Sequence, residues 1–245
     1  MSVDLVSATR HGDVCLVRLQ REAKLNALNA ELAGELIAVM ASDAVTSSRV
    51  VVLAGSAKAF SAGADLTEFT DPSPEENIRY YREQGRIWEL LPALPQPSIA
   101  AIAGWAIGGG LELALSADLR VADETARFGL PEVSLGILPS AGGMTRLVRL
   151  LGTARAKELI LLGERFDAAR ALELGVVNRV VAAGQAEQAA LEWAQKMAEQ
   201  PQSALQVTRE LIDRSAEMSL AASLAAERLA QGMLAQSAES YRADA

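Results

Sequence analysis

The segment with the strongest structural signal in this chain reads Gly104-Trp105-Ala106-Ile107-Gly108-Gly109-Gly110-Leu111-Glu112-Leu113-Ala114. It directly follows Ser98–Ala103, a short apolar run that is typical of a buried strand. Adjacent glycines at a strand-to-helix transition let a ligand approach bare backbone, and the first helical turn offers unpaired N–H groups. This pattern predicts a place that stabilises a developing oxyanion. Close packing of the helix on a sheet would also explain the glycines, and the segment alone does not separate the two interpretations.

Similar apolar runs occur on both sides of this segment and alternate with helical patterns. The other predicted strands are Val14–Leu19, Val50–Ala54, Leu119–Ala122 and Val176–Val181. Apolar residues recur at helical spacing over residues 29–44 and 75–91, and prolines at positions 92, 95 and 97 are expected to end the second helix. A short helix over Ala168–Leu174 is predicted from Asp167 as its N-cap and Gly175 at its end. Strands that alternate with helices indicate an α/β fold.

The pattern beyond residue 184 is helical almost to the end of the chain. The predicted helices are Ala186–Gln200, Ser203–Ser215 and Leu220–Gln236. The last of them is apolar on more than one side, which favours a subunit interface over an internal core helix. We therefore predict a catalytic core over residues 1–184 and a helical region for oligomerisation over residues 185–245.

The composition of the 245-residue chain narrows its possible functions. A net charge of −8 works against a nucleic-acid binder, which needs clustered Lys and Arg. Cys15 is the only cysteine and is expected in a strand, and His11 is the only histidine and is expected in a turn, so an internal disulfide and a Cys/His metal cluster are excluded. Residues Met1–Arg10 show no leader pattern, and no apolar run reaches the roughly 18 residues of a membrane span. We expect a soluble cytoplasmic protein without a metal site.

Two further segments carry potential chemistry. Ala59-Phe60-Ser61-Ala62-Gly63-Ala64-Asp65-Leu66 is a second glycine-containing segment that follows an apolar strand. The other segment, Phe128-Gly129-Leu130-Pro131-Glu132, lies shortly after a different apolar strand and ends in a carboxylate. Glu112 lies two residues beyond the three glycines, so the first helical turn would hold it beside the oxyanion site. Glu132 taken alone is typical of a solvated loop.

The order and spacing of these motifs resemble the crotonase, or enoyl-CoA hydratase/isomerase, superfamily from about Val14 to about Val181. The similarity rests on Lys24–Leu28, Ser61–Leu66, Gly104–Ala114, Ser116–Asp118, Phe128–Glu132, Gly136–Gly143 and Leu172–Val177. The resemblance implies a spiral of ββα units followed by a C-terminal helical region that trimerises. It also implies a homotrimer, or a homohexamer built as a dimer of trimers.

The resemblance further implies roles for individual residues. The backbone N–H groups of Ala64 and Gly109 match the oxyanion hole that holds a thioester oxygen. The positions that match contacts with coenzyme A or the substrate are Lys24, Ala62, Asp65, Leu66, Gly108 and Ser140. Hydratases usually have glycine where Ser140 stands, so this position is expected to affect substrate preference. Coenzyme A is then part of the substrate, and no separate cofactor is expected.

The two glutamates distinguish between reactions within that superfamily. Glu112 resembles the base that activates water, and Glu132 resembles the acid that gives a proton to the α-carbon. Mutual repulsion disfavours ionisation of both carboxyls at once, which suits one base and one acid. The leading hypothesis is a 2-enoyl-CoA hydratase that adds water in the syn sense. A Δ3,Δ2-enoyl-CoA isomerase, another crotonase-type acyl-CoA enzyme, and a non-catalytic acyl-CoA or RNA-binding protein are the alternatives.

Overall fold

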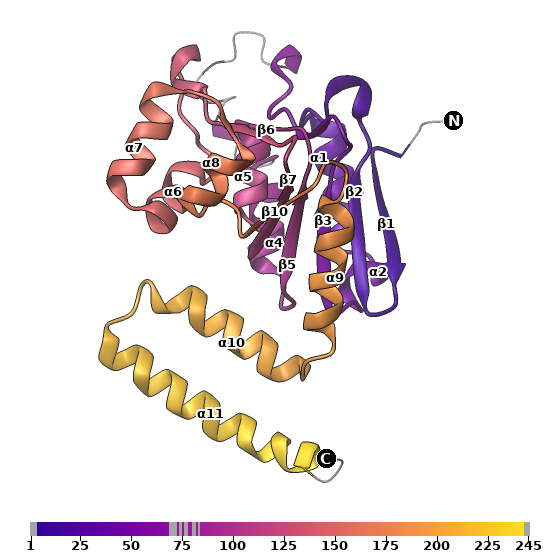
Figure 1. Cartoon of the computed structure of the whole chain (residues 1–245), viewed down its shortest axis with the longest axis vertical. Coiled ribbons are helices and arrows are strands. Elements are labelled where there is room, and N and C mark those ends of the chain that lie inside the picture. The colour runs from indigo at the N-terminus through magenta and orange to yellow at the C-terminus, as the bar shows by residue number, and fades with distance from the viewer. Residues whose placement is uncertain are drawn as a thin grey trace.

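The computed structural model describes residues 4–68, 73, 75, 78, 79, 82 and 84–242. Two sheets and the helices that cover them form the body of the molecule, and two long C-terminal helices extend from it (Figure 1). The predicted α/β fold is confirmed. Within the described residues, no helix combines the length and the hydropathy that a membrane crossing requires.

The larger sheet has six strands in the order β1-β2-β3-β5-β7-β10. Its strands are β1 (Val6–His11), β2 (Val14–Leu19), β3 (Val50–Ala54), β5 (Ser98–Ile102), β7 (Leu119–Asp123) and β10 (Arg179–Val181). Only the β1–β2 hairpin is antiparallel, and the other neighbours are parallel. The predicted strands all belong to this sheet.

A smaller sheet with the order β4-β6-β8-β9 was not predicted from the sequence. Its strands are β4 (Ala59–Ser61), β6 (Trp105–Ile107), β8 (Arg127–Gly129) and β9 (Phe166–Asp167). Strands β4, β6 and β8 are parallel neighbours. Each follows a strand of the larger sheet, so the pairs β3–β4, β5–β6 and β7–β8 step from one sheet to the other. This alternation produces the spiral of ββα units that the resemblance implied.

Helices cover both faces of the larger sheet, which explains why its strands are almost continuously apolar. Val50 and Val52 of β3 pack in one cluster with α9 (Ala186–Ala198), which contributes small residues such as Ala190 and Ala194. Val51 and Leu53 point to the opposite cluster. That cluster includes residues of α1 (Ala30–Met40), α2 (Asp43–Thr46), α4 (Ile87–Ala93) and α5 (Gly109–Leu115). The many alanines allow this close approach in a chain with few aromatic residues.

The remaining helices lie toward the end of the spiral and beyond it. They are α6 (Gly143–Leu151), α7 (Thr153–Leu162), α8 (Ala168–Leu174), α10 (Gln202–Ser215) and α11 (Leu220–Arg242). Helix α8 matches its prediction, because the Asp167 side chain accepts a hydrogen bond from Arg170 N–H and Gly175 is left-handed at the C-cap. Single 3₁₀ turns are η1 (Glu22–Lys24), η2 (Leu66–Glu68), η3 (Gln84–Arg86) and η4 (Glu132–Leu135).

Helices α10 and α11 form a hairpin that stands apart from the sheets in Figure 1. Polar contacts tie its first helix to the body, among them the ion pair between Arg209 and Asp118 at 2.7 Å. No residue of α10 is buried. By contrast, α9 packs on the larger sheet. The predicted division between residues 184 and 185 stays a prediction, although the first helix beyond it shares the sheet's core.

Several predicted boundaries differ from the structure. His11 is the last residue of β1 and pairs with Val14, so the expected turn begins one residue later. The helix expected over residues 29–44 breaks after Met40 and resumes at Asp43. The strand expected from Val176 begins only at Arg179, because the N–H groups of Val176 and Val177 both bond back to the Ala171 carbonyl of α8.

The helix predicted over residues 75–91 lies largely outside the described residues. Its last part is α4, which begins at Ile87 and continues through Pro92 to Ala93. Pro92 therefore does not stop the helix where the sequence predicted. A proline removes one backbone donor, and the carbonyl of Trp88, four residues earlier, consequently lacks its usual helical partner.

Candidate active site

Three segments that follow the carboxyl ends of parallel strands meet at one pocket. Strand β4 leads into residues 62–66, β6 leads into α5, and β8 leads into η4. Ligands of sheets with parallel strands bind outside these carboxyl ends. The pocket encloses about 190 Å³ and is lined by residues of all three segments and of the 137–141 loop.

The segment after β4 is held by the loop around Asn26. The carbonyl of Gly63 accepts from Leu28 N–H at 2.7 Å, and the carbonyl of Leu28 accepts from Asp65 N–H at 2.9 Å. Asn26 is buried, has a φ of 53°, and its amide donates to the carbonyls of Ala59 and Phe60. These bonds leave the N–H of the intervening residue, Ala64, free of a protein acceptor among the described residues.

The start of α5 brings a second free N–H group to the same place. Gly109 is the first residue of the helix, and within the described residues its N–H also has no protein acceptor. A Cβ atom added at Gly109 would lie 3.6 Å from the Ala64 nitrogen, so the two donors are close neighbours. At Gly110 a Cβ would collide with the carbonyl of Ser61. The glycines thus allow the close packing that was one interpretation of this segment, and the oxyanion site stays a prediction.

Glu112 lies on α5 and is only 3% exposed. Its Oε1 accepts from Ala141 N–H at 2.9 Å and from Gly143 N–H at 2.8 Å. Burial raises the pKa of this carboxyl, while these two hydrogen bonds and the nearby Arg146 act in the opposite direction. The fixed donors favour the charged form and hold the carboxylate in one orientation.

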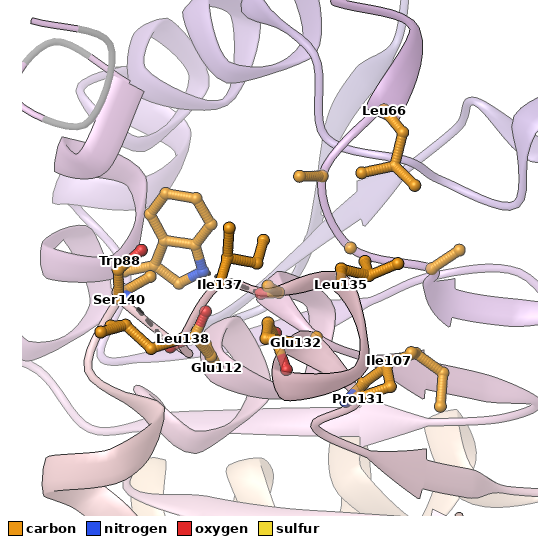
Figure 2. Close-up of a pocket in the computed structure, with 16 residues that line it drawn as sticks. Leu66, Trp88, Ile107, Glu112, Pro131, Glu132, Leu135, Ile137, Leu138 and Ser140 are labelled. Atoms are coloured by element: carbon orange, nitrogen blue, oxygen red, sulfur yellow. Dashed lines mark hydrogen bonds between the residues drawn. The ribbon is translucent and has the colours of Figure 1, made fainter. Parts of the chain in front are cut away.

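Glu132 opens η4 and is 8% exposed, so the interpretation as a solvated loop residue is wrong. Its Oε2 is buried and has no hydrogen-bond partner in the described structure. Burial, with a smaller contribution from the charge of Glu112, raises its pKa to about 7. Figure 2 shows both carboxyl groups among the residues that line the pocket. One carboxyl is anchored by two N–H donors, and the other has a buried oxygen without a partner among the described residues.

The other residues predicted at the site fall into two groups. Ala62, Leu66 and Gly108 line the pocket, as does Ser140. Lys24 lies exposed in η1 and is not among the described lining residues.

Asp65 also lies outside the described pocket lining. Its carboxylate binds Thr67 and forms an ion pair with Arg21 at 2.6 Å. Those two interactions, led by the Thr67 hydrogen bond, lower its pKa to about 2. Its backbone N–H and carbonyl are engaged by Leu28 and Glu68. In this structure Asp65 thus stabilises the turn after β4.

The family model described as enoyl-CoA hydratase/isomerase matches residues 9–243. The chain belongs to this family. A probable enoyl-CoA hydratase of Rhizobium meliloti (strain 1021) is 42% identical over 93% of this chain and 88% of its own length. The 2,3-dehydroadipyl-CoA hydratase of Escherichia coli (strain K12) is 41% identical over 90% of this chain and 86% of its own. The crystal structure of an enoyl-CoA hydratase from Bacillus anthracis superimposes with a TM-score of 0.86 at 39% identity, covering 93% of this chain and 90% of that one.

Membership of the enoyl-CoA hydratase/isomerase family does not by itself identify the residues that support the carboxylates and the backbone donors. Asn26 was part of a quoted motif, but the sequence did not indicate that its side chain anchors β4. Arg146 and Trp88 contact the backbone around Glu112 and Gly109, and neither was predicted at the site. A buried Asn at a left-handed position can be suspected from sequence, whereas a contact between residues 88 and 146 has no local signal.

Proposed function

We propose that this chain is an enoyl-CoA hydratase, a carbon–oxygen lyase that adds water across the 2,3 double bond of a 2-enoyl-CoA to give a 3-hydroxyacyl-CoA. Glu112 takes a proton from water as the water oxygen bonds to C3. The π electrons move toward C2 and the thioester oxygen, which the N–H groups of Ala64 and Gly109 stabilise as an oxyanion. Glu132 delivers its proton to C2 from the same side of the double bond. Proton exchange between the carboxyls then restores the starting state.

The observation that carries this proposal is the unequal environment of the two buried carboxyls. Burial raises the pKa of Glu112, but its two fixed N–H donors oppose that rise and favour its charged form. Glu132 has a buried oxygen without a partner and a pKa raised to about 7, which favours its protonated form at neutral pH. Paired groups whose environments differ in this way divide the roles of base and acid. The reaction takes its atoms from water and substrate, so the proposal includes no cofactor.

The proposed substrate has an uncharged acyl chain. Beyond the carboxyls, the pocket is lined by apolar side chains, including Ile107, Leu135, Ile137 and Leu138 (Figure 2). A terminal carboxylate would lose its hydration there without gaining a cationic partner among the described lining residues. We therefore expect crotonyl-CoA to be hydrated with a higher kcat/KM than 2,3-dehydroadipyl-CoA.

Binding of the coenzyme A portion is also a proposal. Lys24 is exposed on η1, immediately before the loop that anchors residues 62–65, and it supplies a local cation in a chain of net charge −8. We propose that it meets the phosphates, and that Ala62, Asp65 and Leu66 lie along the nucleotide end.

The direct test is the rate of crotonyl-CoA hydration, followed by loss of the conjugated enoyl absorbance. Glu112→Gln and Glu132→Gln should each reduce kcat by about 100- to 10,000-fold, because each removes one proton transfer. Rates that stay within about threefold of wild type in both variants would overturn the assignment. A 3-enoyl-CoA assay separates the isomerase alternative, in which Glu132 alone shuttles a proton and Glu112→Gln would retain activity.

We further propose that the chain assembles as a homotrimer or a dimer of trimers through α10 and α11. Large apolar side chains stand exposed on this hairpin, including Ile212 at 66%, Leu229 at 72% and Met233 at 77% exposure. Apolar side chains that cluster in this way on a helix are typical of an association surface. Light scattering at micromolar concentration tests the proposal, and a monomer would contradict it.

A further inference from the structure

Pro92 leaves a backbone carbonyl of α4 without its helical donor, and a side chain of another helix donates a hydrogen bond to it. Pro92 lies inside α4 and has no N–H, so the Trp88 carbonyl one turn earlier has no helical donor at that position. The Nη2 of Arg146, on α6, donates to this carbonyl at 2.9 Å. An unpaired buried carbonyl is costly, and this contact removes the cost while joining α4 to α6.

The second terminal nitrogen of the Arg146 guanidinium contacts the loop that holds Glu112. This nitrogen, Nη1, donates to the Ala141 carbonyl at 2.9 Å. The N–H groups of Ala141 and Gly143 are the donors that fix Oε1 of Glu112. Gly142 between them has a φ of 98°, and a Cβ there would collide with the guanidinium. Arg146 therefore packs directly on the turn that orients the carboxylate.

The Trp88 side chain reaches the oxyanion donor. Its Nε1 donates to the Gly109 carbonyl at 2.8 Å, and Trp88 as a residue is 4% exposed. A Cβ added at Gly109 would lie 3.1 Å from the Trp88 ring, so ring and backbone are in tight contact. The ring thus limits where the first residue of α5, and with it the Gly109 N–H, can lie.

We propose that Arg146 and Trp88 are positioning residues that form a clamp, which fixes the oxyanion donor Gly109 and the base Glu112 relative to each other. The guanidinium donates one hydrogen bond to the Trp88 backbone and another to the loop that holds Glu112. The Trp88 indole in turn donates to the backbone of Gly109. The inference rests on the proposed hydratase function. Catalysis that depends on donors and base acting on one substrate is sensitive to displacements of about 1 Å.

The charge of Arg146 gives the clamp a second, separable effect. Glu112 faces the Glu132 carboxyl from η4 and the Arg146 guanidinium from α6, and Glu89 of α4 faces Arg146 in turn. The guanidinium opposes the burial that raises the pKa of Glu112. Removing the charge should therefore raise the pKa of Glu112. The loss of hydration rate at low pH, here called the acidic limb of the pH profile, should then begin at a higher pH.

The experiment measures the pH profile of crotonyl-CoA hydration for Arg146→Met, Arg146→Lys and Trp88→Phe. Arg146→Met should lower kcat at least about tenfold and move the loss of rate at low pH to a higher pH, with KM changed less than about threefold. Arg146→Lys keeps the charge but cannot hydrogen-bond both carbonyls. The acidic limb should therefore remain at the wild-type pH, while kcat falls. Trp88→Phe keeps most of the ring and should lower kcat about tenfold without moving the limb. Arg149→Met, an exposed position on the same helix, is the matched control.

A binding measurement tests the clamp without turnover. Acetoacetyl-CoA has no 2,3 double bond to hydrate, but its thioester oxygen can use the same two N–H donors. Calorimetry should show about tenfold weaker binding to Trp88→Phe than to wild type. If wild type hydrates crotonyl-CoA and the Arg146 and Trp88 variants match it in kcat, acidic limb and binding, the clamp is wrong. If wild type itself does not hydrate, the proposed function fails. Because Trp88 also lines the pocket, acetoacetyl-CoA binding by Trp88→Phe that matches wild type would still contradict the clamp in that case.

Discussion

Gly108 shows how tightly single residues are specified at the pocket. Its backbone has a φ of 53° and a ψ of −129°, a conformation that side chains rarely adopt. A Cβ at this position would lie 2.9 Å from Oε1 of Glu132, so even a methyl group would displace the proposed proton donor. The residue before the proposed oxyanion donor, Gly109, is therefore glycine for two independent reasons, backbone conformation and space for the carboxyl.

Gly108→Ala should reduce kcat for hydration about 100-fold or more, because it moves both Glu132 and the neighbouring Gly109 N–H. It should also lower the free energy of unfolding by about 1–3 kcal/mol through backbone strain. Steady-state kinetics and urea unfolding measure the two effects. Gly34→Ala in α1 is the control, since a Cβ there meets nothing within 4 Å. A fully active Gly108→Ala enzyme would show that Glu132 does not need its present position.

Glu132 should also make stability depend on pH. Its folded-state pKa is about 7, against an ordinary value of 4.5, because burial disfavours its charge. The folded state then binds the proton more tightly, so this stabilising contribution is complete below pH 4.5 and is lost as the pH rises through 7. Glu132→Gln removes the charge that must be buried at high pH. The variant should gain up to about 3 kcal/mol over wild type between about pH 4 and pH 8.

Urea unfolding at both pH values measures that difference. Glu124→Gln, at an exposed position, controls for loss of a carboxylate elsewhere. A difference between Glu132→Gln and wild type that does not grow with pH would mean that Glu132 is no harder to ionise in the folded protein than in the unfolded chain.

At the scale of elements, the loop around Asn26 positions Ala64, one of the two proposed oxyanion donors. Residues 25–28 bond to the backbone of residues 62, 63 and 65, which fixes the peptide of Ala64 between them. Asn26 supports this arrangement from a buried left-handed position, where its amide bonds two carbonyls and its Oδ1 accepts from Arg21 N–H. Asn tolerates this conformation better than most residues.

Asn26→Ala should therefore cost about 2–4 kcal/mol of stability, from unpaired buried carbonyls and an unfavourable backbone conformation. It should also lower kcat, because Ala64 loses its support. Thermal unfolding and hydration kinetics report the two effects. Asn26→Asp keeps the acceptor for Arg21 N–H but turns a carboxylate oxygen toward the carbonyls of Ala59 and Phe60 in a buried site, so a loss at least as large is expected. Wild-type stability in Asn26→Ala would assign the loop's rigidity to the backbone bonds alone.

At the scale of the whole molecule, the α10–α11 hairpin is the least self-supporting part. Leu229 and Met233 lie one turn apart on α11 and are 72% and 77% exposed. Burying such a pair between subunits would stabilise the assembly by roughly 2–4 kcal/mol per chain. The sheets have their own two-sided core, which does not include α10 or α11.

Leu229→Glu combined with Met233→Glu should thus convert the proposed oligomer to monomer, because charges would have to be buried at the contact. Light scattering measures the assembly, and the far-ultraviolet circular dichroism of the sheet core should remain. Glu227→Gln on the same helix is the control. An unchanged oligomer in the double variant would place the interface elsewhere.

The sequence by itself determined the local features of this protein. Strands β2 and β3 and helix α8 follow from apolar runs and caps, and their bounds agree with prediction because those signals lie within a few neighbouring residues. The order of the glycine and glutamate motifs also indicated the family, which the family model confirms over residues 9–243.

The tertiary structure decided which of those residues meet. Strands β4, β6, β8 and β9 are two or three residues long, too short for a pattern of their own, yet three of them bring residues 62–66, α5 and η4 to one pocket. The burial of Glu132, the donors to Glu112 and the contacts of Arg146 and Trp88 depend on residues distant in the chain. Local sequence specifies backbone conformation, but the pKa of a carboxyl and the direction in which an N–H group points depend on the residues that the fold packs around them.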